Sequence, residues 1–284
     1  MSAKAGDILN YRILASADGN YDLSVRYRTG KIETDTLLEA SLDGVSVATI
    51  PLTESLSVAT AILRSIPITE GQHIVSFKLT SGNADFLDFT LLKNQPVIPL
   101  TLDFSTNVDG HIYSDGNWAL RNGRLTLTET RASGKRLYGN KNWGDYTVEV
   151  SVTPLETPNC GLLVRATNPG APNFMNNAPT MDEAATGTDW VEGYFVGLTE
   201  DAVILGKQSY GYKELSQKSG RFEAQKTYRL KVICQGARLH VYVNGELYID
   251  YTDETPFLQG MVGIRCCHSS AAFDDFAIIG DSAT

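Results

Sequence analysis

The chain has 284 residues, a formal net charge of −9 and an isoelectric point near 5.0. This length allows one large domain or two ordinary domains, each able to close its own hydrophobic core. The acidic balance, without any Lys/Arg cluster, argues against nucleic acid as a partner, and no apolar run reaches the ~20 residues that cross a bilayer.

The first part of the chain alternates apolar and polar residues in short runs. Between Tyr21 and Arg28 the apolar side chains recur at every second position, which predicts a half-buried strand. Further strands are predicted at residues 37–42, 45–51, 61–67, 73–80 and 86–92. Asp43-Gly44 is typical of a two-residue hairpin turn. Antiparallel strands joined by tight turns predict a β-sandwich.

A connection with two prolines follows these strands. Pro96 and Pro99 resist both helix and ladder pairing, so we place the domain boundary there. The predicted organisation is a first domain at 1–93, a linker at 94–100 and a second domain at 101–284. Because the chain begins in a strand-like segment, we also expect it to be a piece of a larger protein.

The second domain shows the same strand-like pattern and no sustained helical period. Strands are predicted at residues 123–130, 145–154, 161–167, 191–199, 202–208, 227–235, 238–244, 246–251, 261–267 and 272–279. Asn244-Gly245 is the strongest hairpin signal in the chain. The predicted fold class is therefore all-β, with two β-sandwich (jelly-roll) domains.

The four cysteines are Cys160, Cys234, Cys266 and Cys267, and they have no CxxC spacing. We interpret them as buried free thiols rather than metal ligands. A disulfide between Cys234 and Cys266 stays open at this point.

Several short motifs follow one another in order across residues 6–92. They are GDILNY at 6–11, GNYDLSVRY at 19–27, LDG at 42–44, GQHIV at 71–75 and FLDF at 86–89. In this order the first domain resembles a family 6-type carbohydrate-binding module, which implies a β-sandwich and, at Asp88, part of a structural calcium site. The family's first strands and one of its tryptophans have no counterpart here, so we expect a structural or spacer role.

A second series of motifs covers nearly all of the second domain. It comprises LDF at 102–104, WALRNGRL at 118–125, WGDY at 143–146, GLLVR at 161–165, GYFVGL at 193–198, YVNG at 242–245, GMVGI at 260–264 and FDDF at 273–276. The domain resembles a concanavalin A/laminin G-like jelly roll similar to the levan-binding family 66 carbohydrate-binding modules and to sugar-hydrolase domains. The resemblance implies oligosaccharide or polysaccharide binding, a secreted or cell-surface location and linkage to a catalytic domain.

The segment GTDWVEGYFVGL at 187–198 combines aromatic and acidic side chains in a strand-like pattern. Alternation places Trp190, Glu192 and Tyr194 on one face, where rings can stack on the CH face of a sugar while carboxylates accept its hydroxyl hydrogens. Asp189 joins them if it lies in the preceding loop. That loop, 168–188, has three prolines and no period, which is typical of a functional loop or a tolerated insertion.

Three further residues complete the predicted ligand site. Arg165 lies in the apolar run GLLVRAT, so its cation needs a carboxylate, a carbonyl or a ligand, and a structural ion pair is the alternative to sugar binding. Lys207 and Tyr210 lie at the end of the next strand, and they come near the same ligand surface if the two strands form a hairpin. Solvated side chains are the alternative.

Carboxylates at the two ends of the second domain suggest a metal site. Asp103, Asp274 and Asp275 could hold calcium, a hard cation with six to eight oxygen ligands, and unpaired surface carboxylates are the alternative. The four histidines lie far apart in sequence, with no zinc-binding or triad spacing.

The predicted function is non-catalytic carbohydrate binding, as the ancillary part of a secreted glycoside hydrolase that targets plant or fructan-type polysaccharide termini. Asp189 and Glu192 would face opposite sides of a strand, which disfavours them as a pair of glycosidase carboxylates. Two alternatives remain: a glycoside hydrolase acting on a modified disaccharide, and a laminin G-like adhesion module that binds a protein.

Overall fold

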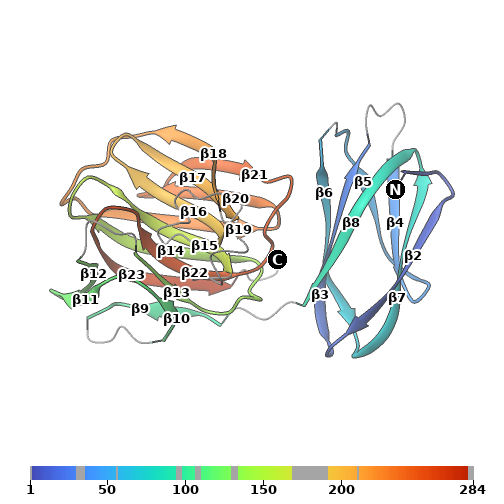
Figure 1. Cartoon of the computed structure of the whole chain (residues 1–284), viewed down its shortest axis with the longest axis horizontal. Helices are drawn as coiled ribbons and strands as arrows, with labels where there is room; N and C mark the ends of the chain where they lie inside the picture. Colours follow the sequence, from blue (N-terminus) through green and yellow to red (C-terminus); the bar gives the residue numbers. More distant parts are fainter. Residues whose placement is uncertain are drawn as a thin grey trace, which may run out of the picture. The chain divides into compact units, whose positions relative to one another are not determined.

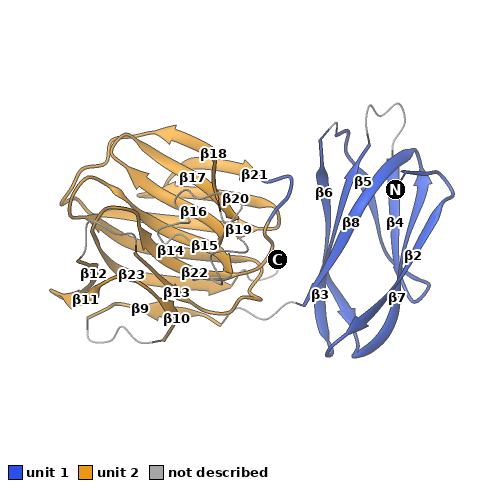
Figure 2. Ribbon diagram, in the orientation of Figure 1, with its two compact units in different colours: residues 1–95, 253–256 blue, residues 96–252, 257–284 orange. Residues whose placement is uncertain are grey.

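The structure is a computed structural model that describes residues 2–29, 36–55, 57–93, 98–105, 110–128, 134–167, 191–209 and 211–280. Within these ranges every helix or strand assigned is a strand, which confirms the all-β fold class (Figure 1). Two compact units are distinguished: unit 1 comprises 1–95 with 253–256, and unit 2 comprises 96–252 with 257–284 (Figure 2). The division after residue 95 falls inside the predicted linker.

Unit 1 is built from two four-stranded antiparallel sheets, ordered β1-β8-β3-β6 and β2-β7-β4-β5. Its strands are β1 (Ser2–Lys4), β2 (Ile8–Ala15), β3 (Gly19–Arg28), β4 (Thr36–Leu42), β5 (Val45–Leu52), β6 (Ala59–Ile68), β7 (Gly71–Ser81) and β8 (Asn83–Lys93). All strands predicted for this region are present, and β1 and β2 were not predicted. The resemblance to a family 6-type module stays a prediction.

The core of unit 1 follows from the period of two along its strands. On β3, Tyr21, Leu23, Val25 and Tyr27 are buried in one apolar cluster. Asp22 departs from the expected alternation because it is 1% exposed. Its carboxylate accepts hydrogen bonds from the Ser65 backbone N–H and the Arg64 guanidinium, which satisfy the buried charge.

Unit 2 consists of a seven-stranded sheet, ordered β10-β13-β22-β15-β16-β17-β18, and an eight-stranded sheet in which β11-β12-β23-β14-β19-β20-β21 is joined by β9 beside β23. The first sheet contains β10 (His111–Ser114), β13 (Gly134–Tyr138), β15 (Asn159–Thr167), β16 (Glu192–Thr199), β17 (Ala202–Ser209), β18 (Tyr212–Ser219) and β22 (Met261–Cys266). The second contains β9 (Leu100–Leu102), β11 (Trp118–Arg121), β12 (Arg124–Leu127), β14 (Tyr146–Pro154), β19 (Tyr228–Gln235), β20 (Arg238–Val243), β21 (Glu246–Thr252) and β23 (Ala271–Gly280).

Both faces of the seven-stranded sheet are buried at its strands β15, β16 and β22. On β15, Leu162 and Val164 belong to the main core between the two sheets. Leu163 points the other way and belongs to a separate apolar cluster with Phe195. We call the face that carries Leu163 and Phe195 the outer face.

Strands β10, β13 and β18 of this sheet escaped sequence prediction. The sequence of β13 is GKRLY and that of β18 is KELSQK after Tyr212, so neither shows a clean apolar period. The two predicted hairpin turns are confirmed, because Asp43, Gly44, Asn244 and Gly245 all have positive φ.

The four cysteines are buried and free, which confirms the interpretation as buried thiols and means that no Cys234–Cys266 disulfide forms. Among the described residues there is no helix with the length and apolarity needed to cross a membrane.

Candidate functional site

Arg165 lies inside unit 2 rather than on a ligand surface. Both register patterns of β15 are irregular around this residue, and its φ is 52°, so the strand bulges and redirects the side chain. Its guanidinium donates to the Asp145 carboxylate at 2.9 Å and to the Phe257 carbonyl at 2.7 Å, and it also donates to the Gly236 carbonyl.

The backbone of Arg165 is also hydrogen-bonded inside unit 2. Its N–H donates to the Tyr146 hydroxyl at 2.5 Å, and burial raises the pKa of Tyr146 well above its usual value, so that hydroxyl stays neutral. Arg165 is 1% exposed. The ligand contact predicted for Arg165 is therefore corrected to the structural ion pair that was its alternative.

The hairpin predicted from β16 to β17 is present, with Tyr194 opposite Lys207 and Glu192 opposite Ser209. Tyr194 is 1% exposed, and its hydroxyl accepts the Phe257 N–H at 2.9 Å. A sugar cannot stack on that ring. The predicted face is thus corrected: the side of β16 that carries Tyr194 faces the other sheet.

Glu192 and Lys207 are half-buried at the end of the same inward side. The Lys207 ammonium lies 4.8 Å from the Phe257 ring centre and 5.8 Å from that of Tyr194. Thr167 donates to Glu192 at 3.5 Å. The other three predicted ligand residues, Asp189, Trp190 and Tyr210, lie outside the described residues.

The outer face of the seven-stranded sheet carries a different set of side chains. Register pairing aligns one row across five strands, and this row comprises Lys135, Arg265, Gly161, Gly197 and Ile204. The adjacent row comprises Leu137, Gly263, Leu163, Phe195 and Gly206. Glycines in both rows leave room above the sheet for large neighbouring side chains.

Phe195 and Arg265 occupy part of this room. A Cβ on Gly197 would meet the Phe195 ring at 2.6 Å, so the ring lies over that glycine. The Arg265 guanidinium lies 4.6 Å from the ring centre, a cation–π distance, and Arg265 is only 2% exposed.

Tyr212 covers the next glycine along. A Cβ on Gly206 would meet the Tyr212 ring at 2.1 Å, and this tyrosine is 39% exposed. Its register partner on β17 is Gln208, which is 2% exposed. An accessible aromatic ring therefore lies over Gly206, beside a buried amide on the outer face.

Lys135, at the other end of the row, is fully buried and paired. Its ammonium lies 2.7 Å from Asp115 Oδ2, and its backbone N–H donates to Asp115 Oδ1 at 2.8 Å. The Tyr113 hydroxyl also donates to Asp115, at 2.9 Å. Burial, together with the Asp115 charge, raises the pKa of Tyr113 well above its usual value, so the phenol stays protonated.

The carboxylates predicted to bind calcium have other contacts. Asp88 accepts from Arg26 Nε at 2.8 Å, and Asp103 accepts from the Ser105 N–H and hydroxyl. The Arg26 contact holds the pKa of Asp88 below its usual value.

Pairing of β9 with β23 brings Asp103 towards Asp274 and Asp275, as predicted for the two ends of the domain. Asp274 Oδ1 accepts the Asp275 N–H, and Asp275 Oδ2 accepts from Ser151. The described part of the chain contains no group of three or more His, Cys, Asp or Glu side chains that could hold a metal. Calcium binding stays a prediction.

The outer-face residues escaped sequence reasoning for two reasons. Lys135 and Asp115 lie on or beside strands without an apolar period, and Arg265 lies within the apolar run MVGIRC. The usable signal was Arg265 itself, a cation in a buried strand, by the same argument that singled out Arg165.

Comparison with solved structures finds several chains of low sequence identity to this one. The family 66 carbohydrate-binding module from Bacillus subtilis is 20% identical, with 61% of this chain and 98% of that chain covered and a TM-score of 0.47. A Bacillus subtilis protein of unknown function with a galectin-like fold is 16% identical, with 66% and 97% covered and a TM-score of 0.49. The Emp47p carbohydrate recognition domain is 12% identical, with 65% and 97% covered and a TM-score of 0.47.

A search of curated proteins finds no match. A family model, the 3-keto-alpha-glucoside-1,2-lyase-like domain, matches residues 104–279, which is more than half of the chain and nearly the whole of unit 2. The carbohydrate-related role expected for the second domain agrees with this match. The chain therefore belongs to the family of 3-keto-alpha-glucoside-1,2-lyase-like domains.

Proposed function

We propose that unit 2 binds a carbohydrate, without cleaving it, on the outer face of its seven-stranded sheet. The observation that carries the proposal is the Tyr212 ring, which is 39% exposed and lies over Gly206 in the same row as Phe195. A ring held against the backbone loses little freedom when a sugar stacks on it.

Buried polar groups beside that ring support the outer face. The Gln208 amide is next to Tyr212, and Arg265 and Lys135 follow across the sheet. Arg265 stacks on Phe195, and Lys135 is anchored by Asp115, so both cations are already desolvated and held in place. Because both side chains are buried, they hold the outer face in shape beneath the ring and do not themselves contact a ligand.

The affinity we expect is in the micromolar to millimolar range, which suits small polar ligands on open surfaces. The family match and the resemblance to levan-binding modules support a role as the ancillary part of a secreted glycoside hydrolase. On this basis the ligands to test first are the termini of plant and fructan-type polysaccharides.

A glycan array followed by calorimetry tests the proposal. Tyr212→Ala should weaken binding of the best array ligand at least tenfold, about the value of one stacking contact with its buried area. Tyr242→Ala is the matched control, because Tyr242 is a half-buried tyrosine on the other sheet that contacts Lys231. Equal affinity in both variants would remove the outer face from consideration.

A second function, cleavage of a modified disaccharide, is favoured by the family description and by the Tyr113–Asp115–Lys135 cluster. A 1,2-elimination from a 3-keto-glucoside removes the C2 proton and breaks the C1–oxygen bond, so it needs acid and base groups near one another. Release of the leaving group from a 3-keto-α-glucoside is the assay. Turnover that is lost in Tyr113→Phe would replace the binding proposal.

A further inference from the structure

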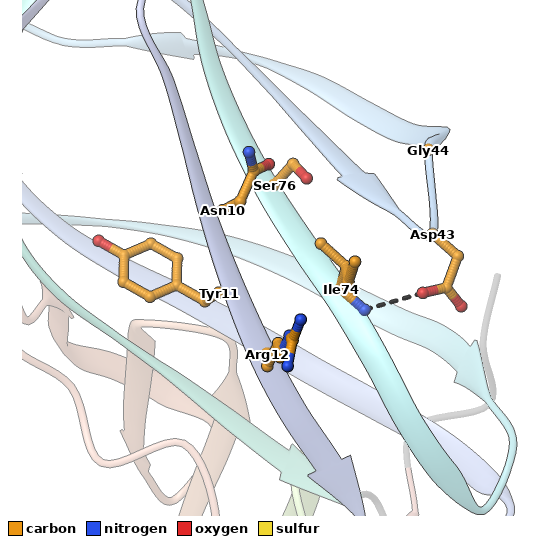
Figure 3. Close-up of a pocket in the computed structure, with 7 residues that line it drawn as sticks. All are labelled: Asn10, Tyr11, Arg12, Asp43, Gly44, Ile74 and Ser76. Carbon is orange, nitrogen blue, oxygen red and sulfur yellow. Dashed lines mark hydrogen bonds between the residues drawn. The ribbon is translucent and has the colours of Figure 1, made fainter.

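Unit 1 has a pocket of its own on the outside of the sheet β2-β7-β4-β5. Its volume is about 620 Å³, and Figure 3 shows the residues that line it: Asn10, Tyr11, Arg12, Asp43, Gly44, Ile74 and Ser76. The Tyr11 ring extends away from the other side chains and contacts Phe77 and Phe89. The pocket therefore places polar side chains around a mostly apolar surface, with Ile74 as its apolar side chain.

Asp43 forms a rigid wall of this pocket. It occupies the β4–β5 turn with φ at 50°, and its Oδ1 accepts the Ile74 N–H at 2.8 Å (Figure 3). Its Oδ2 lies 2.7 Å from His73 Nδ1, and His73 in turn contacts the Thr69 carbonyl through Nε2. The carboxylate is thus oriented before any ligand arrives.

Three other polar side chains of the pocket are uncommitted. Within the described part of the chain, no hydrogen bond or ion pair engages the side chains of Asn10, Arg12 or Ser76. Asn10 is the register partner of Ser76, and Arg12 is the register partner of Ile74. A guanidinium, an amide and a hydroxyl therefore converge on one apolar side chain.

The register also separates the two charged groups. Arg12 lies on one side of Ile74, and Asp43 lies on the other, because the Asp43 N–H donates to the Ile74 carbonyl. Two strand spacings of about 4.8 Å place their backbones roughly 10 Å apart. A ligand between them meets a cation at one end and a hydrogen-bond acceptor at the other.

We infer that this pocket binds a hexuronate, a sugar that carries a carboxylate. The carboxylate pairs with the two-pronged guanidinium of Arg12. Ring hydroxyls donate to Asp43 and accept from Asn10 and Ser76, while the CH face rests on Ile74, which is 44% exposed. A neutral sugar has no carboxylate to pair with Arg12. A phosphate dianion has no hydroxyl to donate to Asp43, and its charge is repelled by the Asp43 carboxylate.

Titration of the intact chain with galacturonate tests the inference. The readout is calorimetry together with the NMR signals of arginine Nε–Hε groups, where the signal missing from Arg12→Gln identifies Arg12. We expect the Arg12 signal to shift on addition of galacturonate but not of galactose. Arg12→Gln should weaken galacturonate binding at least tenfold, about the value of a charge-assisted hydrogen bond.

Three comparisons make the result decisive. Arg28→Gln, an exposed arginine on the other sheet of unit 1, should bind galacturonate as the unmodified chain does. Tyr212→Ala should also bind normally, which separates this pocket from the site proposed for unit 2. The inference is overturned if galactose or inorganic phosphate binds as well as galacturonate, if Arg12→Gln binds unchanged, or if galacturonate does not bind.

Discussion

Arg165 donates to Asp145 at 2.9 Å, with an arginine side chain that is 1% exposed and a carboxylate that is 20% exposed. Arg165→Met removes the guanidinium donor from two backbone carbonyls and from that carboxylate, which keeps the Gly236 N–H. Breaking a buried pair in this way destabilises by about 3–5 kcal/mol. We expect a loss of that size in the free energy of unfolding of unit 2.

Urea unfolding followed by tryptophan fluorescence measures this loss, because all three tryptophans, Trp118, Trp143 and Trp190, belong to unit 2. Arg221→Met is the control, since its side chain is 85% exposed and pairs with Glu223 at the surface. A loss below about 1 kcal/mol in Arg165→Met would show that the internal bonds contribute little.

Gly206 sets the position of the Tyr212 ring. In Gly206→Ala the new methyl would approach the ring to 2.1 Å, so the ring must move off the sheet. We expect sugar binding by unit 2 to weaken about as much as in Tyr212→Ala, while the melting temperature changes little because Tyr212 is 39% exposed. Normal binding in Gly206→Ala would show that the ring's position is irrelevant to the ligand.

Asp115 neutralises a lysine that is fully buried. Asp115→Asn leaves the Lys135 ammonium without its counter-charge and should cost about 3–5 kcal/mol of unfolding free energy. Lys135→Met in the same chain removes the orphaned charge and should restore most of the loss. A double-mutant cycle measures the coupling, and a coupling energy near zero would contradict the pairing.

The pair formed by His73 and Asp43 predicts a pH window. Hydrogen bonding to Asp43 raises the pKa of His73 above 6.5, and the bond to His73 lowers the pKa of Asp43 below 3.8. The stability that His73 contributes is fully present below pH 6.5 and is lost as the pH rises through its raised pKa. The stability that Asp43 contributes is fully present above pH 3.8 and is lost as the pH falls through its lowered pKa.

The pair should therefore stabilise unit 1 fully between pH 3.8 and pH 6.5. NMR titration of the His73 ring should give a pKa above 6.5 that returns towards 6.5 in Asp43→Asn. Glu39→Gln, on the same sheet, should leave the His73 titration unchanged. An unaltered His73 pKa in Asp43→Asn would refute the pairing.

The cysteines give a test of the fold of unit 2. All four are buried and free, and burial raises the pKa of the Cys266 thiol. We expect almost no reaction with a thiol-specific disulfide reagent in the native chain, and four reactive thiols per chain in guanidinium chloride. Fewer than four in the denatured chain under non-reducing conditions would indicate a disulfide.

Strand prediction succeeded where one side of a strand meets the core. The runs that became β3, β14 and β19 alternate because every second residue packs inward. It failed at β13 and β18, where charged and polar residues interrupt the apolar period although the strands pair with β22 and β17. Pairing partners far along the chain leave no local period.

Prediction of the site was less successful. The sequence argument correctly required a partner for Arg165 and a hairpin between the strands that carry Tyr194 and Lys207. It chose the wrong side of that hairpin, because both sides of β16 are buried and neither is marked as outward by polarity. The exposed ring, Tyr212, was not among the predicted ligand residues.

The sequence alone determined that this protein is all-β and has two units. It also determined that the cysteines are buried and free, and that the second domain is related to carbohydrate-associated proteins. The hydrophobic period, the turn residues and the order of motifs depend on residues that are close in sequence, so they can be recognised without the structure. Only the tertiary structure decided that Arg165 points into the core while Arg265 stacks on Phe195 above the outer face. The reason is that a period of two defines two faces of a strand, whereas the packing of distant strands decides which face meets the other sheet.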